Sequence, residues 1–157
     1  MLTFTEVLKK TPDLSANGIR TSRVTDAEFA EWRSDLENNF HSQVAAALRF
    51  LEGVQTSKAM ARMRNSYGLK HTAESHQFGY ICNGAMIAAL LMVGVPIRRI
   101  PMSCSVQFAI ERRWLDERAK VARGRYLMMK PAHWPHARPF MGPAINADRQ
   151  MVEQFGC

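Results

Sequence analysis

The sequence is poor in cysteine and has no apolar run of membrane-spanning length. Its 157 residues contain only three cysteines, an odd and sparse set that does not form a disulfide framework and favours a reducing compartment. The most apolar run covers residues 85–95 and falls far short of the roughly 20 residues that cross a bilayer. Residues 1–10 contain three charged side chains and lack the apolar core of a signal peptide. We therefore expect a cytoplasmic protein with no membrane partner.

The sequence also lacks the common motifs of nucleotide and metal sites. It has no Gly-rich phosphate loop and no G-x-G-x-x-G fingerprint. Zinc sites usually contain closely spaced ligand pairs. His71 and His76 are five positions apart, which places them on different faces of a helix, and Cys82 and Cys104 each lack a neighbouring ligand. We therefore expect no metal and no cofactor.

One arrangement for nucleophilic catalysis is present. Cys82 directly precedes a predicted helix, where the helix dipole can lower the pKa of a thiol. His71 would act as its base if two helices fold together. No oxyanion-loop pattern accompanies this pair, and a small buried hydrophobic cysteine explains Cys82 equally well. A small enzyme using His71 and Cys82 is therefore third among the functional hypotheses.

The central stretch of the chain predicts a buried helix. Residues 84–93 are rich in Ala, Leu and Met, which are strong helix formers. Asn83 is a suitable N-cap, and Gly94 followed by Pro96 is a typical stop signal. The helix has no polar face, so we expect it to be buried on every side.

The other predicted elements are short helices and one pair of strands. Thr3 with Glu6 and Thr25 with Glu28 have the spacing of capping boxes. Residues 103–110 alternate as in a half-buried strand, and a turn at residues 101–102 would pair them with residues 95–100. We predict helices at residues 3–10, 26–38, 41–51, 57–65, 66–75, 84–93 and 111–123, with a loop at residues 11–24.

These elements predict a mainly α protein with a small β-hairpin, an α+β fold organised on the buried central helix. The helices at residues 66–75 and 84–93 suggest a helix-turn-helix, and the hairpin after them suits a winged-helix-like core. The central helix has no polar side chain that could contact base edges, so it would be the buried support of such a unit and another element would contact the nucleic acid. We predict one globular domain over residues 1–130 and a Pro-rich strap or tail over residues 131–157.

Charge is unevenly distributed along the chain. Residues 1–55 are mildly acidic with a net charge of −2, whereas residues 56–157 have a net charge of +9 within the total of +7. A basic body favours a polyanionic partner or an acidic protein surface. Residues 57–65 would present cations on one helical face, although a solvated basic surface explains the same pattern.

Our leading hypothesis is a non-enzymatic protein that binds nucleic acid phosphates through a basic helical face. The alternative is a protein-interaction module that docks its basic face on an acidic partner. A homodimer and the choice between DNA and RNA are left open. The predicted phosphate-binding residues are Lys58, Arg62, Arg64, Lys70, Arg98, Arg99, Arg112 and Arg113.

One block of the chain resembles a loose set of small uncharacterised bacterial proteins found around plasmids and integrating elements. The block consists of SYGLKH at residues 66–71, Tyr80-Ile81, Asn83-Gly84-Ala85 and Ile87-Ala88-Ala89. The resemblance covers residues 55–110 and implies a mobile-element context, so our leading hypothesis includes an accessory protein of a mobile genetic element. It implies no activity and assigns no catalytic residues.

Overall fold

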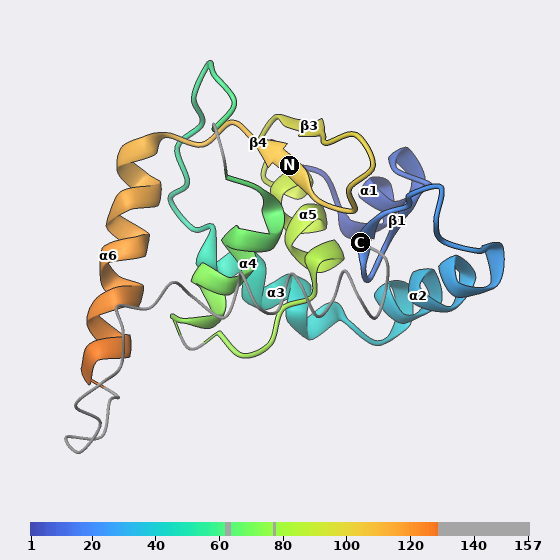
Figure 1. Ribbon diagram of the computed structural model, residues 1–157, viewed down its shortest axis with the longest axis horizontal. Helices are drawn as coiled ribbons and strands as arrows, with labels where there is room; N and C mark the ends of the chain where they lie inside the picture. The colour runs from blue at the N-terminus through green and yellow to red at the C-terminus, as the bar shows by residue number, and fades with distance from the viewer. Residues whose placement is uncertain (62–63, 77, 129–157) are drawn as a thin grey trace.

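The computed structural model describes residues 1–61, 64–76 and 78–128. This part of the chain contains six helices and two short antiparallel strand pairs, which confirms the mainly α fold with a small β-hairpin (Figure 1). The helices are α1 (Phe4–Lys10), α2 (Asp26–Asn38), α3 (His41–Phe50), α4 (Ser66–Glu74), α5 (Asn83–Met92) and α6 (Arg112–Met128). The strands are β1 (Leu14–Ser15), β2 (Gly18–Ile19), β3 (Ile97–Arg99) and β4 (Val106–Phe108).

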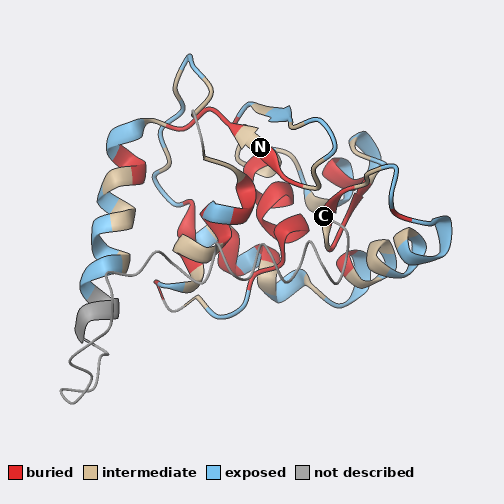
Figure 2. Ribbon diagram, in the orientation of Figure 1, coloured by how far each residue is buried: buried red, intermediate tan, exposed pale blue. Residues whose placement is uncertain are grey.

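Helix α5 is the centre of the hydrophobic core. Residues 83–90 are all buried, and α1, α3 and α4 pack around them (Figure 2). The predicted burial on every side is therefore confirmed for most of the helix, while Leu91 and Met92 at its end are partly exposed. An apolar helix of this kind is stable only when neighbouring elements remove its whole surface from water.

The predicted N-cap of α5 is wrong by one residue. Cys82 is the N-cap, and its Sγ accepts a hydrogen bond from the Ala85 N–H at 3.3 Å. The Asn83 side chain accepts from Ser66 Oγ at 2.7 Å and donates to two backbone carbonyls outside the helix. A buried amide needs such partners, and here a network between distant segments supplies them.

The β1–β2 hairpin packs backbone against backbone on the start of α5. The Gly84 N–H donates to the Ala16 carbonyl at 2.9 Å, and a Cβ atom at Gly84 would collide with the carbonyl of Ser15. Gly18 has a φ of +116°, and a Cβ there would collide with the carbonyl of Cys104. Both glycines are required for this close approach. The sequence predicts only a loop at residues 11–24, so this hairpin was not expected.

The second strand pair follows α5, as predicted. Strands β3 and β4 are antiparallel, with Ile97 opposite Phe108 and Arg99 opposite Val106. The connection covers residues 100–105 and is therefore longer than the predicted two-residue turn. The α4–α5 helix pair and the β3–β4 hairpin occur in the order of a winged-helix core. The winged-helix assignment itself stays a prediction.

The predicted helix at residues 57–65 is wrong in its described residues. Residues 57–61, 64 and 65 are not helical. The Ser57 N–H donates to the Ala109 carbonyl at 3.0 Å and the Ala61 N–H to the Phe108 carbonyl at 2.9 Å. The segment runs beside the β4 end of the sheet because its backbone groups bond there instead of to one another.

Both predicted capping boxes are confirmed. Thr3 Oγ1 accepts from the Glu6 N–H at 3.2 Å, and Thr25 Oγ1 accepts from the Glu28 N–H at 3.3 Å. Among the described residues, none of the helices combines the length and apolar character needed to cross a membrane. The single domain over residues 1–130 stays a prediction, and the predicted strap at residues 131–157 lies outside the described residues.

Candidate nucleic-acid interface

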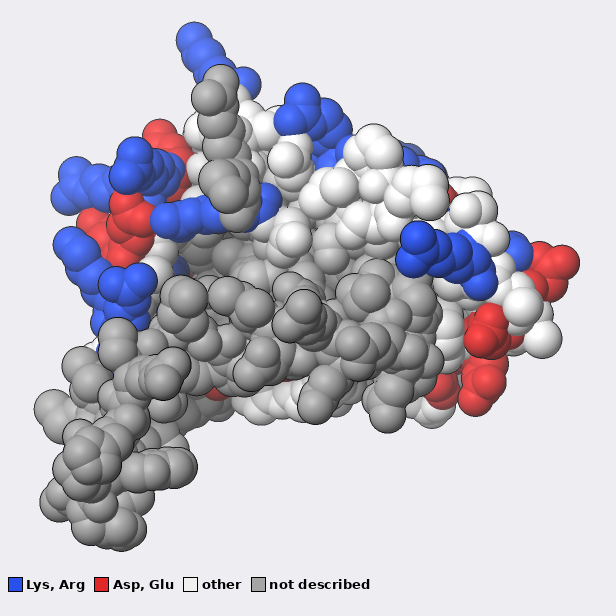
Figure 3. Space-filling model, viewed as in Figure 1, with Lys and Arg blue, Asp and Glu red and all other residues white. Residues whose placement is uncertain are grey.

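Strand β4 has a cationic segment on each side and leads into α6. Strand β3 pairs with one edge of β4, and residues 56–61 bond along residues 108–110. The Glu111 N–H at the start of α6 also donates to the Gln55 carbonyl at 2.8 Å. Lys and Arg side chains are seen along the edge formed by the loop, β3 and α6 (Figure 3). We call six exposed cations of this edge the basic rim: Lys58, Arg98, Arg112, Arg113, Lys120 and Arg123. Arg99 of β3 is also exposed but is left out because it pairs with Asp13.

Helix α6 is anchored through one face and exposes the other. Trp114 and Leu115 are buried against the core. A ring nitrogen of His76, Nε2, lies 2.7 Å from the Arg118 carbonyl, and the Arg118 guanidinium lies 5.0 Å from the Trp114 ring. Four rim residues of α6 are spaced along its opposite face. These residues are Arg112, Arg113, Lys120 and Arg123.

Acidic side chains pair with two of these cations at the surface. Arg113 Nε donates to Glu117 Oε1 at 3.1 Å, and Arg112 Nε lies 3.5 Å from Asp116 Oδ2. The Arg112 and Arg113 side chains are 91% and 87% exposed. Exposed pairs of this kind are worth at most about 1 kcal/mol, so water and other anions compete for these arginines.

The other predicted phosphate-binding residues are placed differently. Arg64 Nη2 donates to Asp116 Oδ1 at 2.8 Å. Arg99 forms two contacts with the Asp13 carboxylate, at 2.5 and 2.8 Å. Arg98 belongs to the rim, although its guanidinium also donates to Gln107 Oε1 at 3.0 Å. Arg62 lies outside the described residues.

Lys70 is buried and is not part of the rim. Its Nζ lies 3.2 Å from Glu74 Oε1 and about 5 Å from the rings of Tyr67 and Tyr80. Glu74 Oε1 also accepts from the Ile81 N–H at 3.1 Å, which ties the end of α4 to the segment before α5. Lys70 therefore holds the core together, and a phosphate cannot reach it in this structure.

Glu74 is ionised in this cluster. Burial is the largest influence and raises the pKa of its carboxyl. The hydrogen bonds from His71 and the Ile81 N–H, with the charge of Lys70, together outweigh burial and hold the pKa below its ordinary value of 4.5. An ionised Glu74 is the charge that a buried Lys70 needs as its partner.

His71 and Cys82 have separate partners. His71 Nδ1 lies 2.7 Å from Glu74 Oε2, and His71 Nε2 is buried without a hydrogen-bond partner in the described part of the chain. Burial raises the pKa of the Cys82 thiol to about 11, despite the backbone N–H of Ala85 that lowers it. Cys82 is thus a protonated, buried cap residue near neutral pH, contrary to the low pKa that a nucleophile needs.

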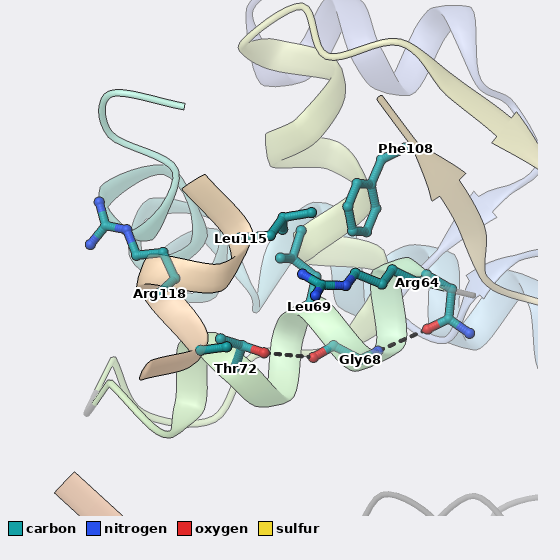
Figure 4. A pocket seen from close by; sticks show the side chains of 9 residues that line it. Arg64, Gly68, Leu69, Thr72, Phe108, Leu115 and Arg118 are labelled. Atoms are coloured by element: carbon teal, nitrogen blue, oxygen red, sulfur yellow. Dashed lines mark hydrogen bonds between the residues drawn. The ribbon is translucent and has the colours of Figure 1, made fainter. Parts of the chain in front are cut away.

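A pocket of about 210 Å³ lies between α4 and α6. Leu69, Phe108 and Leu115 form much of its wall (Figure 4). The Arg64 side chain points toward this wall, whereas the Arg118 guanidinium points away from it. The remaining lining residues are Asn65, Gly68, Thr72 and Ala119.

The acidic partners of the rim arginines and the pocket were not predicted from the sequence. The spacing of Arg112 to Asp116 and of Arg113 to Glu117 is i,i+4, a signal that predicts both helical pairs. The Arg64–Asp116 pair joins residues 52 positions apart, and no local pattern predicts it. Among the described residues, no group of three or more His, Cys, Asp or Glu side chains could hold a metal ion.

Comparisons with known proteins add no further assignment. No protein-family model matches the sequence, and no match was found to a curated protein or to a solved structure.

Proposed function

We propose that the protein binds nucleic acid through the basic rim, as an accessory protein of a mobile genetic element. The observation that carries the proposal is the convergence of six exposed cations from three segments on one edge. Phosphates attract such cations whatever the base sequence. The mobile-element context rests on the resemblance of residues 55–110.

The surface ion pairs of α6 are compatible with phosphate binding. Glu117 and Asp116 are themselves well exposed, at 60% and 41%. Exchanging such a carboxylate for a phosphate therefore requires little desolvation, unlike the exchange of a buried partner. An extended phosphate backbone can contact β3, residues 56–61 and α6 together because these segments are neighbours at β4.

The experiment is fluorescence anisotropy with labelled DNA and RNA across a salt series. For the natural protein on duplex DNA, the logarithm of the binding constant should fall linearly with the logarithm of the salt concentration, with a slope near −0.9 per phosphate contact. The double variant Arg112→Glu/Arg113→Glu should bind at least tenfold more weakly, with a slope reduced by about 2. Its two side chains are exposed, so the free energy of unfolding should change little.

The matched control is Lys9→Glu/Lys10→Glu at the end of α1. It makes the same change in net charge at two exposed residues outside the rim. Equal weakening by both variants would show that net charge, not the rim, governs binding. If the natural protein binds no nucleic acid at 50 mM salt, the proposal is wrong, and an acidic protein becomes the partner to seek by pull-down.

A further inference from the structure

The pocket between α4 and α6 adjoins the basic rim. Arg64 lines the pocket and donates to Asp116, and the same carboxylate lies 3.5 Å from Arg112 of the rim. A chain held by its phosphates on α6 therefore passes close to the pocket. This continuity relates the pocket to the proposed function.

The pocket has an apolar wall and polar groups that mainly donate hydrogen bonds. Leu69, Phe108 and Leu115 provide the wall. One guanidinium nitrogen of Arg64 bonds to Asp116, which leaves other N–H groups of this five-donor side chain. Asn65 Oδ1 accepts from the Gly68 N–H at 2.9 Å, so its amide nitrogen is the group left to donate. Such a lining suits a flat ligand with an acceptor-rich edge.

Gly68 keeps the pocket open. It lies in the first turn of α4 and lines the pocket. A Cβ there would meet only Asn65 Oδ1, at an ordinary distance of 3.5 Å. Neither a close backbone approach nor a positive φ requires glycine here, in contrast to Gly18 and Gly84. The space beside Gly68 is therefore available to a ligand.

The size of the pocket limits the ligand. Sites that bury a drug-sized molecule usually measure about 300–1,000 Å³, and this pocket of about 210 Å³ is smaller. It fits one ring system and not a whole nucleotide. The sugar and phosphate of that nucleotide would lie outside, next to α6.

We infer that the pocket receives one unpaired base of a nucleic acid strand held on the basic rim. This inference rests on the proposed function. The base would stack against the apolar wall of Leu69, Phe108 and Leu115, as bases do on side chains in single-strand sites, and its edge would face the Arg64 guanidinium. Guanine matches the donors best, because its N7 and O6 are two adjacent acceptors that arginine recognises.

The test compares three ligands of equal length: a guanine-containing single strand, a single strand of abasic deoxyribose phosphates, and a duplex. The natural protein should bind the base-containing strand about 5- to 150-fold more tightly than the abasic strand, the range expected for stacking one base. Replacing the guanines by thymines should lower the affinity of the single strand further.

The variant Gly68→Leu should remove this preference by filling the pocket. It should bind the intact and abasic single strands alike, and its affinity for the duplex and the salt dependence of the rim should be unchanged. The control Gly124→Leu puts the same side chain on α6 at a site with nothing within 4 Å of its Cβ, and should keep the preference. Circular dichroism and thermal unfolding of both variants check that they fold.

The outcomes distinguish the two proposals. Equal affinity of the natural protein for the intact and abasic strands overturns the base pocket and leaves rim binding in place. A preference that survives in Gly68→Leu also overturns it, and assigns base stacking to another surface. Failure to bind any of the three ligands overturns the proposed function together with this inference.

Discussion

Helices α4 and α6 contain ion pairs of the same spacing in very different surroundings. Lys70 and Glu74 are 3.2 Å apart, and their side chains are 5% and 22% exposed. Arg113 and Glu117 are 3.1 Å apart, and their side chains are 87% and 60% exposed. The two pairs have the same sequence spacing and nearly the same distance, and they differ in burial. The buried pair is structural, whereas the exposed pair can release its arginine to a ligand.

The difference comes from what packs on each helix. Helix α4 lies against α3, α5 and α6, and the rings of Tyr67 and Tyr80 flank Lys70 Nζ. Helix α6 packs through Trp114 and Leu115 and presents its other face to water. A basic residue on α4 is therefore part of the core, whereas basic residues on α6 are available to a partner.

The glycines of α5 and α6 also differ in their surroundings, and replacing the glycine of α5 should have the largest effect on the free energy of unfolding. Gly84→Ala should destabilise the protein by about 3 kcal/mol, because overpacking costs about 1–3 kcal/mol and the lost backbone hydrogen bond about 1 kcal/mol more. Its Cβ would collide with the Ser15 carbonyl and separate α5 from the β1–β2 hairpin. Urea denaturation followed by circular dichroism measures the change.

Gly124→Ala is the matched control on α6. Its Cβ has nothing within 4 Å, and alanine is favoured over glycine in a helix by about 0.5–1 kcal/mol. This variant should be as stable as the natural protein or slightly more stable. A similar loss of stability in both variants would show that the close contact at Gly84 is not what stabilises α5.

The next effect distinguishes the two ion pairs directly. Lys70→Met should cost about 2–3 kcal/mol, less than the full loss of a buried partner because Glu74 is only partly buried. Arg113→Met breaks a pair of the same spacing on α6 and should cost less than about 0.5 kcal/mol. The free energies of unfolding in urea give both values. Equal costs would contradict the assignment of Lys70 to the core.

Local patterns in the sequence predicted the parts of the fold that depend on neighbours in the chain. The capping boxes at Thr3 and Thr25 and the apolar run of α5 are such patterns, and all three helices are present. The predicted helix at residues 57–65 failed because its residues bond to the chain around Phe108, about 50 positions away. The hydrophobic periodicity of a short segment contains no information about such a long-range contact.

The candidate site was predicted less completely, for the same reason. Arg112 and Arg113 are exposed, as predicted, because a charged helix exposes most of its cations. Their role in phosphate binding stays a prediction. Lys70 was placed beside them because its sequence neighbours are also basic. The packing of two tyrosines around it, and the pairing of Arg64 with Asp116, arise only from the tertiary fold.

The smallest effect is the response of the two regions to acid and salt. The pKa of Glu74 is lowered in the folded protein, so its contribution is present above pH 4.5 and is lost as the pH falls through the folded pKa. The pKa of Asp116 is also lowered, chiefly by the hydrogen bond from Arg64. The protein should therefore lose stability in acid through both regions. Glu74→Gln and Asp116→Asn should each reduce the fall in the free energy of unfolding between pH 6 and pH 3.

Salt should separate these two contributions. Exposed charges are strongly screened at 1 M salt, where the Debye length is about 3 Å, whereas buried pairs are screened much less. Urea midpoints between pH 6 and pH 3, measured at 0.05 and 1 M NaCl, provide the comparison. Subtracting each variant from the natural protein removes the shared contribution of Glu6 and Glu28, whose pKa values are also lowered by their capping threonines. The effect of Asp116→Asn on the urea midpoint should shrink clearly in 1 M NaCl, and the effect of Glu74→Gln should change much less. If salt abolishes both, the Lys70 cluster is as open to solvent as the rim, and the distinction between the two helices fails.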